Sequence, residues 1–351
     1  MIKYFILILL TKLNYCAVMA QPKGVKAILV KQELVFNKPP FAACHAATIV
    51  ALPGNMLLGA WFAGAFESSP DVGIWVAAKV NGHWSTPRMI ADGVINDTLR
   101  FACWNPVLFR TRHGRTMLYY KVGKSPRTWW GMMKFSDDDG KTWSAAEKLP
   151  EGILGPIKNK SVQLSDGSIL HPSSTESLDE KVWNIHLERS DSLSRYWTKM
   201  PIDCDTFGVI QPSILIYSNN RMQLLCRSRQ NYIVQTWSTD NGNTWGRLTK
   251  TNLPNPNAGS DAVSLQSGLQ VLVYNPMPAG KDWFNGRNKL VVAVSEDGNT
   301  WHDIYTLENA STGEFSYPAI IQTNDRNLHI LYTYDRKNIK HVELTLRNTA
   351  K

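Results

Sequence analysis

A short turn that occurs three times places the strongest constraint on how this 351-residue chain folds. The copies read Ser136-Asp-Asp-Asp-Gly-Lys-Thr-Trp143, Ser238-Thr-Asp-Asn-Gly-Asn-Thr-Trp245 and the shorter Ser295-Glu-Asp-Gly-Asn-Thr-Trp301. In each copy an Asp side chain is suited to cap backbone N–H groups, a Gly supplies a positive φ, and Thr-Trp begins the next strand. A recurring turn of this kind indicates a recurring structural unit.

Two degenerate copies extend the series, Asn81-Gly-His-Trp84 and Ser190-Asp-Ser-Leu-Ser-Arg-Tyr-Trp197. The Trp residues at positions 84, 143, 197, 245 and 301 are therefore 59, 54, 48 and 56 residues apart. This spacing suits four-stranded propeller blades, for which about 40–50 residues is usual before loops are added. Each blade needs a hairpin, and six hairpins with Gly- or Asn-containing bends are found, at 47–61, 106–120, 161–171, 212–226, 262–274 and 318–332.

A third strand follows each hairpin, at 72–79, 130–136, 182–190, 232–238, 290–295 and 339–346. The last unit has no fourth strand of its own. The segment 24–36 is a free strand near the N-terminus that is suited to complete it, which leaves few open edges. The sequence therefore predicts an all-β fold, a six-bladed β-propeller closed by an N-terminal strand.

The first twenty residues have the layout of a secretory signal. Lys3 precedes an apolar run at 4–10, and Val18-Met-Ala20 stands before Gln21. The run is too short to cross a bilayer, which takes about 20 apolar residues. We therefore expect a signal peptide over 1–20 and a propeller domain over 21–351. The mature protein should be a soluble monomer, secreted or periplasmic, with no membrane insertion.

Charge and cysteine content narrow the class of partner. The formal net charge of +9 falls to +7 without Lys3 and Lys12, and Lys and Arg are scattered with no basic run, which disfavours nucleic acid as a partner. A glycan with an anionic sugar is the expected partner. No His, Cys or carboxylate spacing resembles a metal site, so we expect no metal and no cofactor. For Cys44 and Cys103, a disulfide and two buried free thiols both remain open.

In a propeller, the starts of the innermost strands and the exits of the second strands meet at one rim of the central channel. The strand starts carry His45, Asn105, Asn159, Lys160, Gln211, Asp261 and Tyr317. The second-strand exits carry Glu67, Asp71, Lys121, Glu176, Arg227, Arg229, Asn275 and Arg336. Because an unpaired buried ion is strongly penalised, these groups must pair with one another or hold a ligand. Trp104 and Trp130 accompany them and suit stacking on sugar rings.

The Trp turns, the closing strand and the rim residues together resemble the sialidase superfamily, six-bladed propellers whose turn motif is the Asp box. The resemblance covers about 43–346. It implies that Tyr317 is the nucleophile and Asp71 the acid/base. It also implies that Arg227 and Arg287 are two of the three arginines that clamp the carboxylate of the substrate.

Two positions depart from the sialidase pattern. His45 stands where the first clamp arginine is expected, and it lacks the planar bidentate donor set of an arginine. Gln211 stands where a glutamate would activate the tyrosine, and it cannot accept a proton. Hydrolysis of a glycosidic bond still has candidate groups, which are the carboxyls of Glu67, Asp71 and Glu176, a His45 that titrates near neutrality, and an acidic-sugar site of Lys158, Lys160, Arg227 and Arg287.

These observations predict an exported, sialidase-like exo-glycosidase that removes a terminal acidic sugar from glycans. A polysaccharide lyase is an alternative, since β-elimination needs a base and an acid, which His45 and Tyr317 supply. A carbohydrate-binding propeller without turnover is a second alternative, in which His45 and Gln211 mark a lost active site.

Overall fold

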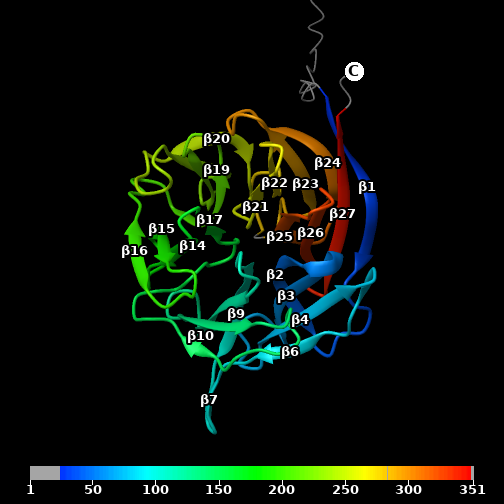
Figure 1. The fold of residues 1–351 in the computed structure, drawn as a ribbon, viewed down its shortest axis with the longest axis vertical. Coiled ribbons are helices and arrows are strands. Elements are labelled where there is room, and N and C mark those ends of the chain that lie inside the picture. Colours follow the sequence, from blue (N-terminus) through cyan, green and yellow to red (C-terminus); the bar gives the residue numbers. More distant parts are fainter. Residues whose placement is uncertain (1–23, 283, 349–351) are drawn as a thin grey trace, which may run out of the picture.

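Six β-sheets surround one central axis in the computed structural model, which describes residues 24–282 and 284–348 (Figure 1). In the described residues the helical structure is limited to one 3-10 turn, η1 (Pro53–Asn55). The predicted six-bladed propeller is thus confirmed. The predicted signal peptide lies outside the described residues.

The first three blades follow one another along the chain, each as an antiparallel sheet numbered from the axis outward. Blade I consists of β2 (Ala43–Leu52), β3 (Met56–Gly64), β4 (Gly73–Val80) and β5 (His83–Trp84), with β6 (Arg88–Ala91) also paired to β4. Blade II consists of β9 (Ala102–Arg110), β10 (Thr116–Gly123), β11 (Trp130–Ser136) and β12 (Glu147–Lys148). Blade III consists of β13 (Val162–Gln163), β14 (Ile169–Glu176), β15 (Trp183–Ser190) and β16 (Trp197–Pro201). Between blades I and II, the hairpin of β7 (Val94–Asn96) and β8 (Leu99–Arg100) projects from the rim (Figure 1).

The other three blades repeat the pattern. Blade IV consists of β17 (Val209–Ile216), β18 (Met222–Ser228), β19 (Tyr232–Ser238) and β20 (Thr249–Pro254). Blade V consists of β21 (Asp261–Ser264), β22 (Gln270–Tyr274), β23 (Lys289–Ser295) and β24 (His302–Asn309). Blade VI consists of β25 (Phe315–Gln322), β26 (Leu328–Tyr334), β27 (Asn338–Asn348) and β1 (Val25–Leu34).

The ring is closed by β1, the first strand, which pairs antiparallel with β27, the last. This arrangement confirms the predicted closure. The joint between blades VI and I also contains a buried polar cluster. Lys79 of β4 donates to Glu33 of β1 at 2.8 Å, and a ring nitrogen of His341 in β27 lies 3.1 Å from the same carboxylate.

The three Asp boxes bend the chain and also join neighbouring blades. In the box of blade V, the Asp297 carboxylate accepts the Ser295 hydroxyl at 3.0 Å and the Thr300 N–H at 2.7 Å. The Trp301 ring of this box packs into an apolar cluster with Leu215 and Leu225 of blade IV. Each box therefore fixes the distance and the angle between two sheets.

The innermost strands begin earlier than the sequence predicted in four blades. Strands β2, β9, β17 and β25 continue toward the axis past a β-bulge, where the residue pairing with the second strand shifts. At the bulge a residue other than Gly has a positive φ, and these residues are Ala46, Asn105, Gln211 and Tyr317. A bulge redirects the side chains beside it. Three of the predicted site residues therefore lie at bulges inside strands.

The described part of the chain contains no helix with the length and apolarity needed to span a bilayer. Its four cysteines, Cys44, Cys103, Cys204 and Cys226, are buried and free. Of the two alternatives for Cys44 and Cys103, the structure has the free thiols.

Candidate functional site

The hydroxyl of Tyr317 is the centre of a polar cluster built from three blades. Arg227, in β18, donates from Nη1 to the Tyr317 hydroxyl at 2.5 Å, and Nε2 of Gln211, in β17, lies 3.5 Å from the same oxygen. The rings of Tyr317 and His45, in β2, are 4.2 Å apart between centroids. The structure thus brings together four of the predicted site residues, and a guanidinium stands where it stabilises negative charge on the phenol oxygen.

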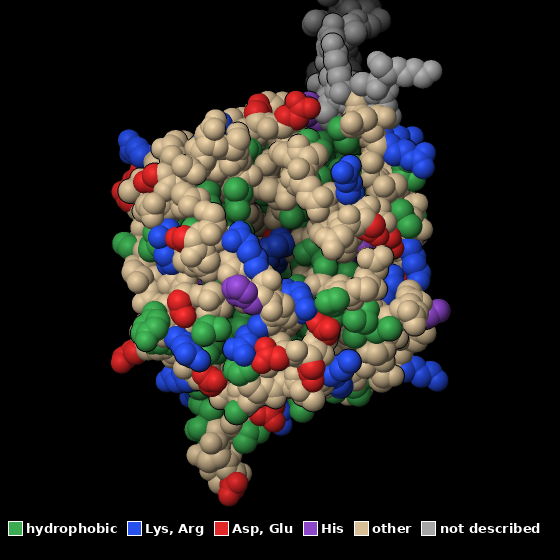
Figure 2. All heavy atoms as spheres, viewed as in Figure 1, with side chains coloured by type: hydrophobic (Ala, Val, Ile, Leu, Met, Phe, Trp, Pro, Cys, Tyr) green, Lys and Arg blue, Asp and Glu red, His purple; other side chains and the backbone are tan. Residues whose placement is uncertain are grey.

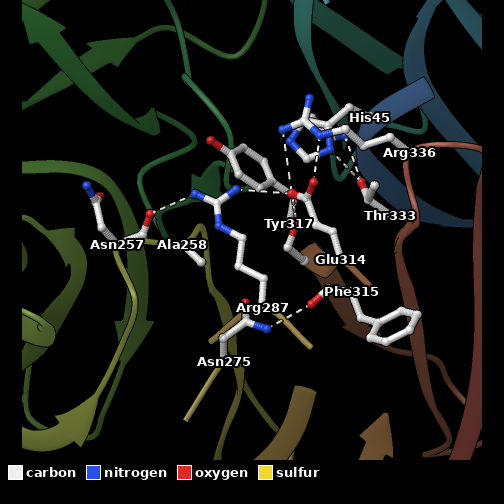
Figure 3. A network of polar contacts seen from close by, with 12 residues as sticks. His45, Asn257, Ala258, Asn275, Arg287, Glu314, Phe315, Tyr317, Thr333 and Arg336 are labelled. Carbon is white, nitrogen blue, oxygen red and sulfur yellow. Dashed lines mark hydrogen bonds and ion pairs between the residues drawn. The ribbon is translucent and has the colours of Figure 1, made fainter. Parts of the chain in front are cut away.

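Two further arginines meet beside this cluster at a buried carboxylate, Glu314 (Figure 3). Arg287 Nη1 donates to Glu314 Oε1 at 3.0 Å, Arg336 Nε donates to Oε2 at 2.6 Å, and the Ser316 hydroxyl donates to Oε1 at 2.7 Å. Burial opposes ionisation of Glu314, but Arg336 and Arg287 hold its pKa below the usual value. Glu314 is therefore a charged anchor that holds both guanidinium groups in place.

His45 is buried and is neutral in this setting. Its Nδ1 lies 2.9 Å from the Thr333 hydroxyl. Burial lowers the pKa of His45 well below its usual value, and the positive charges of Arg336, Arg287 and Arg227 lower it further. The expectation of a group that titrates near neutrality is therefore wrong, because it left out the burial of the ring and the surrounding arginines.

A cavity of about 390 Å³ opens beside His45. Its wall contains the aromatic rings of Phe62 and Phe66 and the ion pair in which Arg336 Nη1 donates to Glu67 Oε2 at 2.5 Å. Glu67 is thus held by Arg336 at the edge of this cavity. The combination of an apolar wall and a few charged groups is typical of small-molecule sites.

Lys158 lies under the tyrosine and fixes its backbone. Its Nζ donates to the carbonyl oxygens of Pro318 at 2.5 Å and Ser260 at 3.0 Å, and to Asn159 Oδ1 at 2.9 Å. Burial lowers the pKa of Lys158 to about 7, although Asp261 opposes this shift. Because Pro318 directly follows Tyr317, these bonds hold the bulge that carries the phenol.

Several other predicted site residues are bound to groups of the protein itself. Lys160 Nζ donates to Asp261 Oδ2 at 2.7 Å, Lys121 donates to the Pro156 carbonyl, and Asn275 Nδ2 donates to the Phe315 carbonyl at 2.8 Å. The contacts of Lys121 and Asn275 join neighbouring blades, whereas the contact of Lys160 joins blade III to blade V. A role of Lys160, Asp261, Lys121 or Asn275 in substrate binding remains a prediction.

Glu176, at the end of β14, is a partly buried carboxyl near the cluster. Burial raises its pKa, while Arg227, Arg229 and Arg127 reduce the shift. The guanidinium carbons of Arg229 and Arg227 lie 4.0 and 5.4 Å from the centre of the Trp183 ring. Glu176 therefore holds a proton to a higher pH than an ordinary glutamate.

The remaining predicted residues make their contacts with groups other than Tyr317. The Asp71 carboxylate is held within its own loop, where it accepts the Ala65 N–H at 2.9 Å and the Ser69 hydroxyl. Trp104 donates from Nε1 to the Gly123 carbonyl at 2.9 Å. Asn105 is buried at the bulge of β9, and Trp130 lines a separate cleft between blades II and III.

Sequence reasoning missed Glu314, Asn257 and Trp183. Asn257 accepts Arg227 Nε on its side-chain oxygen at 2.7 Å and Arg287 Nη2 on its carbonyl oxygen at 3.1 Å, so it positions both guanidinium groups. The position of Glu314 in the sequence could have indicated a site residue, because it stands three residues before Tyr317 and just ahead of an apolar strand. Asn257 lies in a loop and Trp183 in a third strand, where no pattern marks them.

Positive charge gathers at the axis of the molecule. Lys and Arg side chains surround and line a hollow at the centre of the disc seen in Figure 2. In the cluster itself, His45 is surrounded by the charges of Arg336, Arg287, Arg227 and Lys158. Such a site favours a ligand that carries negative charge.

The fold and the family match of this chain identify its class as a sialidase-superfamily BNR propeller. Residues 55–330 match the family described as BNR repeat-like domain, and the chain belongs to this family. No curated protein matches the chain at a significant level.

Solved structures agree with this assignment at the level of the fold. A protein of unknown function from Dyadobacter fermentans has a TM-score of 0.75 at 15% identity, with 92% of this chain and 100% of that chain covered. The NanB sialidase from Streptococcus pneumoniae has a TM-score of 0.69 at 12% identity, with 89% and 70% covered. The intramolecular trans-sialidase from Ruminococcus gnavus, solved with oseltamivir carboxylate, has a TM-score of 0.68 at 15% identity, with 92% and 98% covered.

Proposed function

We propose that this protein is an exo-glycosidase that removes a terminal acidic sugar from glycans. The observation that carries the proposal is the bond from Arg227 to the Tyr317 hydroxyl, because it fixes the position of the oxygen that would act as the nucleophile, at the centre of the polar cluster. The positive groups around the tyrosine suit a sugar carboxylate. Two proteins of similar fold are the NanB sialidase and an intramolecular trans-sialidase, and their names support the proposal of a glycosidase. We also propose that the chain is exported and acts as a monomer.

The geometry gives the groups distinct tasks. The terminal sugar would lie over Tyr317, with its carboxylate toward Arg227, Arg287 and Arg336. Tyr317 would attack the anomeric carbon and release its phenolic proton to solvent, and a carboxylic acid would protonate the leaving oxygen. Water would then hydrolyse the glycosyl-tyrosine.

We assign proton donation to Glu176 rather than to Asp71. The raised pKa of Glu176 keeps a proton available nearer to neutral pH, which general acid catalysis requires. The Asp71 carboxylate accepts two hydrogen bonds inside its own loop, which suits a structural role. His45, neutral and in contact with the tyrosine ring, would shape the site without carrying charge.

The test is a screen of the purified mature protein against acidic and neutral aryl glycosides and natural glycans, with the products followed by mass and by ultraviolet absorbance. A hydrolase releases a free terminal sugar without new absorbance. A lyase product absorbs through its new double bond, and a binding propeller gives no product.

Variants at the reacting groups make the test specific. On a substrate that the protein cleaves, Tyr317→Phe should lower kcat by at least about 100-fold, because the nucleophile is lost. Asp71→Asn should change kcat much less than Glu176→Gln. If Tyr317→Phe retains full turnover, the proposed mechanism is wrong.

A further inference from the structure

A cleft of about 300 Å³ lies between blades II and III. Its walls come from the loop before β11, the segment after β12 and the end of β14, and its lining includes Arg127, Trp129, Trp130, Lys148, Glu176 and Lys199. We propose that this cleft binds the leaving-group side of the glycan, as a subsite for a sugar that carries a carboxylate or sulfate group. The inference rests on the proposed function and specifies its substrate.

The position of Glu176 indicates which part of the glycan lies in the cleft. A general acid in glycoside hydrolysis protonates the oxygen that departs, so the sugar on that oxygen must lie against the acid. Glu176 is in the wall of this cleft, whereas Tyr317 is not among its lining residues. The terminal sugar therefore lies on the Tyr317 side of Glu176, and the rest of the glycan extends into the cleft.

The lining of the cleft suits a sugar ring. Trp129 and Trp130 present half-buried indole rings, which offer flat apolar faces. Trp129 Nε1 is buried, and within residues 24–282 and 284–348 it has no hydrogen-bond partner. Because this nitrogen is closed to the cleft, the contribution of Trp129 to sugar binding would be an apolar ring contact.

The charge of the lining favours an anionic substituent. Arg127 is paired with Glu180, but Lys148 and Lys199 form no ion pair within the described chain. Lys148 Nζ lies 5.6 Å from the centre of the Trp130 ring, so its charge stands over the aromatic face. Besides Glu176, the acid in the lining is the exposed Glu151. A leaving group with a carboxylate or sulfate would therefore bind better than a neutral one.

The experiment compares two substrates that share the terminal sugar but differ in leaving group, an aryl glycoside and an oligosaccharide. Trp130→Ala should raise the KM for the oligosaccharide about tenfold more than the KM for the aryl glycoside, as expected for loss of an aromatic contact of this size. Lys148→Ala should raise the KM for a sulfated oligosaccharide and not for its neutral counterpart. Matched controls are Trp237→Ala in blade IV and Lys141→Ala in the first Asp box, which should leave the ratio of the two KM values as in the wild type.

The failure of this inference and the failure of the proposed function have different signatures. Turnover with equal changes of KM on both substrates overturns the subsite and leaves the glycosidase intact. If no glycan is cleaved, the proposed glycosidase function is wrong. The subsite is then tested separately, by tryptophan fluorescence with N-acetyllactosamine and its 6-sulfated form. Saturable binding of the sulfated probe that Trp130→Ala abolishes supports the subsite, and absence of such binding overturns it.

Discussion

The site residues of this propeller depend on a few strained backbone positions. Asn105, Gln211 and Tyr317 have φ values of +39°, +55° and +53°, and each is followed by a proline. A non-Gly residue held in this region costs free energy, of order 1–3 kcal/mol, and persists only where the surroundings fix it. At Tyr317 the surroundings include the bond from Lys158 to the Pro318 carbonyl. The strain places a polar side chain at the axis in three blades.

Loss of the guanidinium at the phenol oxygen should be the most damaging single change after loss of the tyrosine. Arg227→Met removes the donor to Tyr317 and should lower kcat by about 100-fold or more, the usual effect of losing one charge-stabilising donor. Arg227→Lys should restore part of the rate. Steady-state kinetics check this, with Arg221→Met as control, since Arg221 lies over Tyr217 and Trp237 in the same blade. Equal rates for Arg227→Met and Arg221→Met would contradict the assignment.

The raised pKa of Glu176 predicts an alkaline limb in the pH profile. The acid works only while protonated, so kcat should be full below its pKa and should fall as the pH rises through it. Glu176→Gln should lose this limb and be slower at every pH, by about 100-fold or more on substrates with poor leaving groups.

Glu176 should favour catalysis but lower the stability of the fold at neutral pH. Since the folded-state pKa is above the unfolded value, ionisation at neutral pH costs stability, and the cost is absent below the unfolded pKa. Glu176→Gln should therefore raise Tm at pH 7 to 8 and leave it unchanged near pH 3. A lower Tm at neutral pH would show that Glu176 is a stabilising ion-pair partner instead.

At the scale of the elements, the Asp box is a joint between blades. The Asp carboxylate closes the turn, and the Trp indole donates back to it, as in the 3.0 Å bond from Trp301 Nε1 to the Gly298 carbonyl. Gly298 has a φ of +76°, and a Cβ there would meet Tyr217 and Trp237 of blade IV. The Gly is therefore required both by its backbone and by the neighbouring sheet.

A change in one box should act on stability without touching catalysis. Asp297→Ala removes acceptors for Ser295 and Thr300 and should cost about 1 kcal/mol, like the loss of a helix cap. Thermal unfolding and kcat/KM measure the two effects, and the exposed neighbour Glu296→Ala is the control. The pKa of Asp297 is lowered in the fold, so its contribution is present above the unfolded pKa of about 4 and is lost as the pH falls through the folded pKa. Loss of activity at unchanged Tm would contradict a structural role.

The sequence predicted the elements better than the site, for a physical reason. Turns, hairpins and strand ends depend on residues close in sequence, and these placed Tyr317, Arg227, Gln211 and His45 at one rim. The bulges were not predictable, because a positive φ at Gln211 follows from the register of two strands. The pairing of Glu314 with Arg287 and Arg336 was not predictable either, because it joins three segments that are distant in sequence. The charge state of His45 depends on the same arginines, so it could not be predicted from the sequence.

At the scale of the whole molecule, the joint between blades VI and I holds the ring together. Glu33, Lys79 and His341 come from β1, β4 and β27, and their cluster is largely buried. Burial opposes ionisation of Glu33, but Lys79, Lys31 and His341 bring its pKa down to about 2. This carboxylate therefore stabilises the closed ring above pH of about 4 and loses its effect as the pH falls toward 2.

Glu33→Gln should leave Lys79 as a buried cation without its anion. We expect a loss of about 2–3 kcal/mol in the free energy of unfolding at pH 7, below the full cost of breaking a buried pair because Glu33 is partly exposed. Urea unfolding measures it. Lys31→Met, which removes an exposed partner of the same carboxylate, should cost less than about 1 kcal/mol. The double variant Glu33→Gln/Lys79→Met should recover part of the loss, and no recovery would contradict this account.

The pairing of β1 with β27 also sets the order of events when the protein is made. Within the propeller, β1 is synthesised before the other strands and its partner β27 after them, so the ring cannot close until β27 has emerged from the ribosome. Until then blade VI lacks its outer strand, and the joint between blades VI and I is absent. Closure of the ring consequently follows the synthesis of β27, and deletion of either β1 or β27 should leave an open, aggregation-prone arc of sheets.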